Sequence, residues 1–350
     1  MGIVVHSATR RKIKDPIFIG VDVGGTNIRS AGYYNSEGRL KRIFRRENKT
    51  ADFNSLNEAV ECLRRMPGVD ARFWQDVAGV SFGIAGAFDG HKVKITNRQE
   101  WKEIDLQEIA EEFGFPNVGG VNDLEATAYG IVAGLDNEEV ITIHPGVKKP
   151  GNQAVIAPGT GLGEGIIIEG KYPVASEGGH SDFAPIGELQ RELAAYLEKK
   201  YPDGSICYED VLSGYGLLNI MDFFIEEKGF EAPYGYSEAV DINEKIGSMF
   251  SGLSKNSLGA KEALIMYFKI LAAEASNLAV KSLSTGGLYL GGTTRKDIPT
   301  LKLFNDMFVN AFINKRKQRQ LLSQIPVQVI KKDDVNEYGA AYFVSRKMSK

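Results

Sequence analysis

A carboxylate stands beside a glycine-rich turn near the beginning of the chain. The segment DVGGTN (residues 22–27) places Asp22 at the end of an apolar, β-rich run, directly before Gly24, Gly25 and Thr26. Aspartate is depleted from strands, so its presence here needs a reason. Glycines let backbone N–H groups approach an anion closely, because no Cβ intervenes. The combination indicates a turn that holds phosphate, with a carboxylate for the cation that accompanies phosphate.

Three more glycine turns follow predicted strands: PGTGLGEG (158–165), SEGGHSD (176–182) and GGTT (291–294). Any one of them is explained by a chain with 39 glycines, which makes many turns. Four such turns at strand ends, rich in Gly-Thr, favour phosphate handling. No segment fits G-x-x-x-x-G-K-[ST] or G-x-G-x-x-G, which argues against a P-loop and against a dinucleotide site of the usual kind.

Two further segments carry polar side chains at predicted strand or helix ends. In VNDLEA (121–126), Asn122 and Asp123 have two readings, a helix cap or a carboxylate that faces a cleft. Glu177 and His180 lie within SEGGHSD, where no second histidine stands at the spacing of a metal site. Polar groups on a glycine turn also suit hydrogen bonds to a polyhydroxyl ligand. Glu209 begins a predicted helix, where compensation of the helix dipole is the simplest role.

A rival motif is GVSFG (79–83), which matches the G-x-S-x-G nucleophile elbow with Ser81 as nucleophile. An elbow joins a strand to a helix. Here the apolar run continues to Asp89, so we expect Ser81 in mid-strand with a buried side chain. A serine hydrolase is the weakest of the functional hypotheses.

The elements that must position these residues alternate between strand and helix. We expect a hairpin (17–23 and 28–34), strands at 77–88, 118–123, 140–143, 154–159, 165–170, 287–292 and 327–330, and helices at 188–200, 217–228, 258–284 and from about 338. This alternation predicts α/β layers, and the hairpin predicts mixed sheets. Two layered halves would leave a cleft between them for a site.

Composition limits the class of protein. With 350 residues, 43% apolar and 25% charged, the chain suits two globular domains. A net charge of −3 gives no overall attraction for nucleic acid or an anionic membrane. No apolar run reaches the roughly 18 to 20 residues that span a bilayer. The two cysteines, Cys62 and Cys207, are far apart, which fits a reducing compartment. We expect a cytoplasmic protein without nucleic-acid or membrane partners.

Together these segments resemble the bacterial-type ATP-dependent glucokinases of the hexokinase and actin-like ATPase superfamily, from residue 17 to about 343. VDVGGTN and PGTGLGEG resemble the two phosphate motifs, and SEGGHSDFAP resembles the sugar signature. TNRQEW (96–101) and NDLEATA (122–128) resemble the approach to the catalytic aspartate. YEDVLSGYGLLNI (208–220) and GGLYLGG (286–292) resemble the later sugar and adenosine segments.

The resemblance implies a two-domain actin-like ATPase (ribonuclease H-like) fold, α/β with mixed sheets and a central cleft. A small domain (1–132 plus 331–350) would carry the first phosphate motif and the catalytic aspartate. A large domain (133–330) would carry the sugar signature and the second phosphate and adenosine motifs.

The resemblance also implies a role for each site residue. Asp123 would be the catalytic base. The sugar would bind to Asn97, Asn122, Asp123, Glu177, His180 and Glu209. ATP would bind to Val21, Asp22, Val23, Gly24, Gly25, Thr26, Asn27, Gly159, Thr160, Gly161, Gly291 and Gly292, the last two near adenine and ribose. Asp22 would hold Mg²⁺, directly or through water.

The activity implied is transfer of phosphate from ATP to the 6-hydroxyl of glucose, a glycolytic step, by a homodimer whose cleft closes on the sugar. A kinase for mannose, fructose or an amino sugar would share every phosphate motif. A sugar-sensing module would bind without turnover. The zinc-using repressor and sugar-kinase relatives carry clustered cysteines after the sugar-binding histidine, whereas Cys207 stands alone, so a repressor is not expected.

Overall fold

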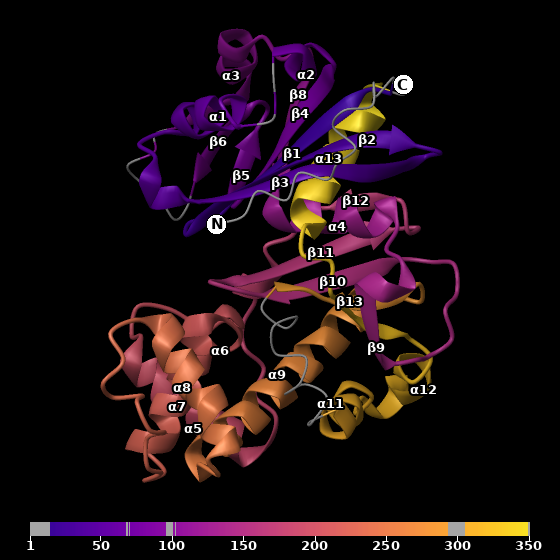
Figure 1. Ribbon diagram of the computed structural model, residues 1–350. Coiled ribbons are helices and arrows are strands. Elements are labelled where there is room, and N and C mark those ends of the chain that lie inside the picture. The colour runs from indigo at the N-terminus through magenta and orange to yellow at the C-terminus, as the bar shows by residue number, and fades with distance from the viewer. Residues whose placement is uncertain are drawn as a thin grey trace. The chain divides into compact units, whose positions relative to one another are not determined.

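The computed structural model describes residues 15–67, 69, 71–95, 101, 103–292 and 305–348. The chain divides into two compact units (Figure 1). Unit 1 comprises the chain up to Asp136 and again from Lys332, and unit 2 is Asn137–Lys331. The resemblance implies divisions a few residues away, after residues 132 and 330.

A five-stranded mixed sheet forms the centre of unit 1, in the order β3-β2-β1-β4-β8. Its strands are β1 (Ile17–Val23), β2 (Asn27–Ser36), β3 (Arg39–Lys49), β4 (Val77–Ile84) and β8 (Val118–Asn122). β1 and β2 form the expected antiparallel hairpin. β1, β4 and β8 run parallel, so their carboxyl ends lie at one edge of the sheet.

The single long strand expected over residues 77–88 is wrong, because the segment forms two strands. β4 ends at Ile84, and β5 (Gly86–Asp89) joins β6 (Lys92–Ile95) and β7 (Ile104–Asp105) in a separate sheet. A Cβ at Gly86 would lie 2.3 Å from the Lys94 carbonyl oxygen, so only glycine allows this close pairing.

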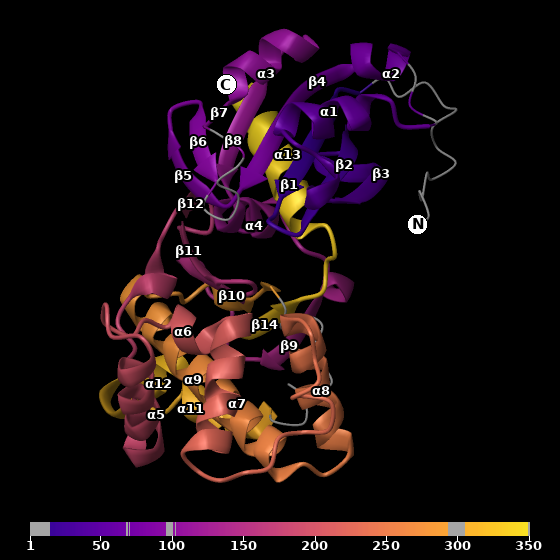
Figure 2. The same ribbon diagram turned by 90° about the vertical axis from the view of Figure 1, so that its left-hand side faces the viewer.

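The helices of unit 1 cover both faces of its main sheet (Figure 2). They are α1 (Leu56–Arg64), α2 (Ala71–Gln75), α3 (Leu106–Phe113), α4 (Asp123–Ala133) and α13 (Val335–Met348), with the short 3₁₀ turn η2 (Thr50–Asp52). α13 packs very closely on β1 and on α4. A Cβ at Gly20 would lie 1.8 Å from the Glu337 carbonyl oxygen. A Cβ at Gly339 would lie 1.8 Å from the Ala126 carbonyl oxygen. This packing brings the first turn of α13 to the end of β1.

Unit 2 has a six-stranded mixed sheet in the order β12-β11-β10-β13-β14-β9. Its strands are β9 (Val140–His144), β10 (Gln153–Pro158), β11 (Leu162–Ile168), β12 (Tyr172–Val174), β13 (Gly287–Leu290) and β14 (Val327–Ile330). Its helices are η3 (Asn137–Glu139), η4 (Gly178–His180), α5 (Gly187–Lys200), α6 (Glu209–Leu212), α7 (Gly214–Glu226), α8 (Ile242–Ser254), α9 (Leu258–Ser282), α11 (Asn305–Phe312), η6 (Arg316–Gln318) and α12 (Arg319–Leu322).

The longest of these helices, α9, confirms the helix predicted from apolar spacing over residues 258–284. It ends at Leu283, which adopts the left-handed conformation with φ of 49°. Among the described helices, α9 alone is long and apolar enough to cross a membrane by length and composition. However, 78% of its apolar window is buried inside the protein, so its apolarity serves the core of unit 2.

Candidate active site

The first phosphate motif forms the tip of the β1–β2 hairpin in unit 1. The Gly24 N–H donates to the Asn27 carbonyl at 3.0 Å, which closes the turn. Thr50 anchors it from outside: its hydroxyl donates to the Gly24 carbonyl at 2.7 Å, and its N–H donates to the Thr26 carbonyl at 3.0 Å. Gly25 and Thr26 are exposed. The turn is therefore rigid and leaves backbone groups open to a ligand.

The two valines predicted to line the phosphates, Val21 and Val23, lie inside the sheet. Both pair with β2 on one side and β4 on the other. Their side chains are 3% and 2% exposed. Gly24, Gly25 and Thr26 are thus the part of the motif that a ligand can reach.

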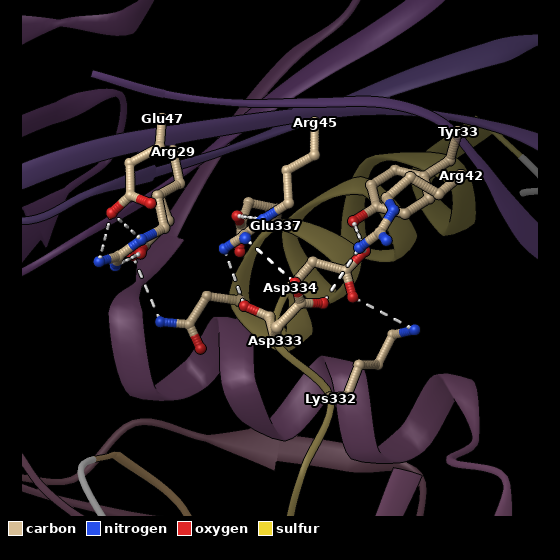
Figure 3. A network of polar contacts seen from close by, with 11 residues as sticks. Arg29, Tyr33, Arg42, Arg45, Glu47, Lys332, Asp333, Asp334 and Glu337 are labelled. Carbon is tan, nitrogen blue, oxygen red and sulfur yellow. Dashed lines mark hydrogen bonds and ion pairs between the residues drawn. The ribbon is translucent and has the colours of Figure 1, made fainter. Parts of the chain in front are cut away.

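Asp22 lies just below this turn and is 6% exposed. Its Oδ2 accepts from Arg29 Nη1 at 3.2 Å, and its Oδ1 accepts from Asn336 Nδ2 at 3.3 Å. Arg29 also pairs with Glu47 at 2.9 Å (Figure 3). Burial raises the pKa of Asp22, and the neighbouring Arg29 charge opposes that rise. Asp22 is thus a buried carboxylate that cationic and amide N–H groups hold in place.

Asp123 stands where β8 ends and α4 begins. Its Oδ1 accepts from the Leu124 N–H at 2.9 Å. Asn122 is the N-cap of α4, with its Oδ1 accepting from the same N–H at 2.9 Å and its Nδ2 contacting the Gly86 carbonyl at 3.4 Å. The helix-cap interpretation of Asn122 is confirmed. Its predicted contact with sugar stays a prediction.

A short chain of hydrogen bonds connects Asp22 with the first turn of α4. Thr127, one helical turn after Asp123, donates its hydroxyl to Asn336 Oδ1 at 2.6 Å. Asn336 in turn donates to Asp22. Asp22 and Asp123 therefore lie at the same edge of one sheet, held by an asparagine more than 300 residues away from Asp22. Neither Thr127 nor Asn336 stood out in the sequence, because nothing local distinguishes them from ordinary helix residues.

In unit 2 the predicted sugar residues come together. His180 Nδ1 lies 3.6 Å from Glu177 Oε2, and His180 Nε2 lies 3.8 Å from Glu209 Oε1. Glu177 directly precedes η4, and His180 is the last residue of η4. Glu209 is the first residue of α6. The side chains of Glu177 and His180 are mostly exposed. We call Glu177, His180 and Glu209 the sugar cluster.

Glu209 also binds the second phosphate motif. Its Oε2 accepts from the Leu162 N–H at 2.7 Å, and a Cβ at Gly161 would lie 2.4 Å from that oxygen. The turn is closed by the Gly159 N–H, which donates to the Gly161 carbonyl at 2.7 Å. Thr160, at its tip, is exposed. Glu209 thus does more than compensate a helix dipole, because it joins the sugar cluster to a glycine turn.

The adenosine motif lies beside this turn at the end of the neighbouring strand. The Gly291 N–H donates to the Ile156 carbonyl at 2.8 Å. Gly292 has φ of +62°, and a Cβ there would lie 2.0 Å from the Pro158 carbonyl oxygen, so glycine is required. The turns that carry Gly159 and Gly292 are therefore adjacent.

Other expected residues have different outcomes. Asn97 lies outside the described residues. Ser81 is fully buried in the middle of β4, as expected, and the strand continues past it, so it forms no nucleophile elbow.

The arrangement around Asp22 suits a cation that binds together with a phosphate group. Among the described residues, no group of three or more His, Cys, Asp or Glu side chains could hold a metal ion. Mg²⁺ in phosphate-transfer sites usually takes one or two carboxylates, with phosphate oxygens and water completing the octahedron. Asp22, a single buried carboxylate under an exposed glycine turn, fits that pattern.

Comparison with known proteins shows which family and which solved structures this chain resembles. A sequence model of the glucokinase family matches residues 19–347. A glucokinase of Nostoc sp. is 32% identical over 351 residues, covering 94% of this chain and 99% of the relative. The solved structure of Balamuthia mandrillaris glucokinase in complex with glucose has a TM-score of 0.77 at 22% identity, covering 97% and 96%. A ROK family glucokinase from Streptomyces griseus in complex with glucose and AMPPNP has a TM-score of 0.66 at 20% identity, covering 94% and 99%.

These solved structures share the fold of this chain, which is the predicted actin-like ATPase fold. More narrowly, the chain belongs to the glucokinase family, whose enzymes phosphorylate a hexose.

Proposed function

We propose that this enzyme transfers the terminal phosphoryl group of MgATP to the 6-hydroxyl of glucose, with Asp123 as general base. One observation carries the proposal: Asp22 and Asp123 lie at one sheet edge beside an exposed glycine turn, joined through Thr127 and Asn336. This arrangement would place the phosphates and the proton acceptor at the same edge of unit 1. The complexes of relatives with glucose and AMPPNP support the choice of substrates.

Phosphoryl transfer needs positioning and charge stabilisation more than covalent help. The open backbone of residues 24–26 and 159–161 would hold the phosphates, with Gly291 and Gly292 close to the nucleoside. Asp22 would hold Mg²⁺, which supplies positive charge to the phosphates when bound. Asp123 would accept the hydroxyl proton late, because the transition state is loose.

The sugar cluster would select the hexose. A carboxylate such as Glu177 accepts hydrogen bonds from hydroxyls, and His180 either donates or accepts. The wrong epimer would leave such groups unpaired at ~1–3 kcal/mol each. A kinase for mannose, fructose or an amino sugar would differ only at this cluster.

The test is a coupled assay of glucose 6-phosphate formation with MgATP, run beside mannose, fructose and glucosamine. Strong turnover with glucose supports the proposal. Turnover with another sugar alone would reassign the sugar cluster, and binding of glucose and ATP without turnover would indicate a sensing module. We further propose a cytoplasmic homodimer in glycolysis, to be checked by light scattering and fractionation.

A further inference from the structure

Two buried carboxyl groups meet in unit 2, and the proposed reaction uses neither. Glu164 on β11 is 3% exposed, and Glu274 on α9 is fully buried. Their carboxyl groups lie close enough for the charge of one to act on the other. α9 packs against the sheet of unit 2, which brings these two residues together across 110 positions of the chain (Figure 1).

This pair needs a proton to be stable. Among the described residues, neither Glu164 Oε1 nor Glu274 Oε1 has a hydrogen-bond donor. Lys281 Nζ lies 3.7 Å from Glu274 Oε1, and its side chain is 60% exposed, so it compensates the charge only in part. Two ionised carboxylates repel and cannot donate, whereas one proton supplies the missing donor. Burial, and then the charge of Glu274, raises the pKa of Glu164 to about 8.

The Glu164 carboxyl supports the turn that carries two of the three residues of the sugar cluster. A Cβ at Gly178 would lie 2.2 Å from Glu164 Oε2, so the carboxyl group is in direct contact with this glycine. Gly178 begins η4, which ends at His180. A Cβ at Gly179 would lie 2.1 Å from the Leu162 carbonyl oxygen. The turn therefore rests on β11, with the Glu164 carboxyl beneath it.

Glu274 supports the segment that carries Glu209, the third residue of the sugar cluster. Its Oε2 accepts from Asn277 Nδ2 at 2.7 Å, and the same amide donates to the Tyr208 hydroxyl at 2.9 Å. The Tyr208 side chain also hydrogen-bonds Glu274. Tyr208 directly precedes Glu209 of the sugar cluster, and Lys315 donates to Asn277 Oδ1. Glu274 is thus fixed to the segment that presents Glu209.

We propose that Glu164 and Glu274 share one proton at neutral pH and that this carboxyl pair positions Glu177, His180 and Glu209 for the sugar. The inference rests on the proposed function, since it takes the sugar cluster as the glucose site. When the proton is lost, two like charges must separate, and Glu164 presses on Gly178. Sugar affinity then falls while the transfer groups of unit 1 are untouched.

Other titratable groups face the pair. They are Tyr208 and Lys281, Lys315 through Asn277, and Glu177 and His180 on the turn. Burial raises the pKa of Tyr208, so it stays protonated, and burial lowers the pKa of Lys315. A substitution of Glu164 alone therefore tests the carboxyl pair, because it leaves these other titratable groups in place.

The kinetic test measures the KM for glucose between about pH 7 and about pH 9. The pKa of Glu164 is about 8, so most of the protein loses the shared proton between these two pH values. If glucose binds only to the protonated form, the KM for glucose rises by about tenfold over that range. In Glu164→Gln the amide donates to Glu274 at every pH, so the profile becomes flat, and Glu274→Gln gives the same result. Glu198→Gln, an exposed change of equal charge on α5, keeps the wild-type rise. A rise that persists in Glu164→Gln overturns the proposal.

Two measurements do not depend on turnover. In the difference spectrum between wild type and Glu164→Gln, infrared spectroscopy should show a protonated carboxyl C=O stretch at neutral pH that fades through about pH 8. A difference spectrum without this band contradicts proton sharing. Calorimetric titration with glucose should show the same pH dependence of Kd as of KM. Glucose binding with that profile but no phosphorylation would leave this inference standing and reject the proposed function.

Discussion

The two units contain buried carboxyl groups with different partners. In unit 1, Asp334 is 1% exposed and has cations on two sides, with Arg42 Nη1 at 2.9 Å and Lys332 Nζ at 3.3 Å (Figure 3). The Tyr33 hydroxyl donates to it at 2.8 Å. In unit 2, Glu164 has another carboxyl group as its partner.

This difference sets the charge of each group. Burial acts to raise the pKa of Asp334, but Lys332 and Arg42 outweigh it, so that pKa lies below its ordinary value. Burial and Glu274 act together on Glu164, so its pKa is raised. Burial alone therefore does not decide whether a carboxyl group is ionised; the charges packed beside it do. The cations beside Asp334 keep it ionised, whereas burial beside a second carboxyl group favours the protonated form of Glu164.

The largest expected effect tests the assignment of transfer to unit 1. Asp123→Ala should lower kcat by about 10²–10⁴-fold, because it removes the proton acceptor. Asp123→Asn keeps an oxygen to accept from the Leu124 N–H and should lose as much activity with the fold intact. Steady-state kinetics and circular dichroism check this. Turnover within tenfold of the parent enzyme in both variants would reject Asp123 as base.

The next effect concerns stability in unit 1. Asp334→Asn should lower the free energy of unfolding by about 3 kcal/mol at neutral pH, because it leaves buried cationic partners without their counter-charge. The neighbouring Asp333 also pairs with Arg42, but its side chain is 60% exposed. Asp333→Asn should therefore cost less than about 1 kcal/mol. Equal losses for the two variants, measured by urea unfolding, would contradict the role given to burial.

The contributions of Asp334 and Glu164 to stability should depend on pH with opposite signs. The lowered pKa of Asp334 gives stability that is present above its ordinary value of 3.8 and is lost as pH falls. The raised pKa of Glu164 gives stability that is present below 4.5 and is lost as pH rises through about 8. The penalty of Asp334→Asn should thus shrink in acid, whereas Glu164→Gln should become more stable than the parent in alkali.

The smallest effect should fall on recognition alone. Glu177→Gln keeps the shape of the side chain but loses a charged acceptor, so the KM for glucose should rise about tenfold. The KM for ATP and kcat should change little, since Glu177 is placed in the sugar cluster. Glu198→Gln is the control, because it removes the same charge at an exposed position. If Glu177→Gln changes the KM for glucose no more than Glu198→Gln does, Glu177 does not bind the sugar.

Local patterns predicted the elements that carry the motifs. The β1–β2 hairpin, the β8–α4 junction with its Asn122 cap and the long helix α9 are all confirmed. Two errors have a physical cause. The run over residues 77–88 is apolar throughout, so its break at Gly86 had no local signal. Strand β3 is mostly polar and basic, with Arg45 and Arg46 among its residues, and was not singled out.

The glycine turns, the strand ends that precede them and the acids placed there can be predicted from local sequence, because turn conformation and strand alternation depend on neighbouring residues. Which polar groups meet depends on the packing of distant segments. Asn336 reaches Asp22, Glu209 reaches Leu162, and Glu274 reaches Glu164 only after helices have packed on sheets. Because a carboxyl group keeps or loses its proton according to burial and nearby charge, its chemical state is a property of those distant contacts.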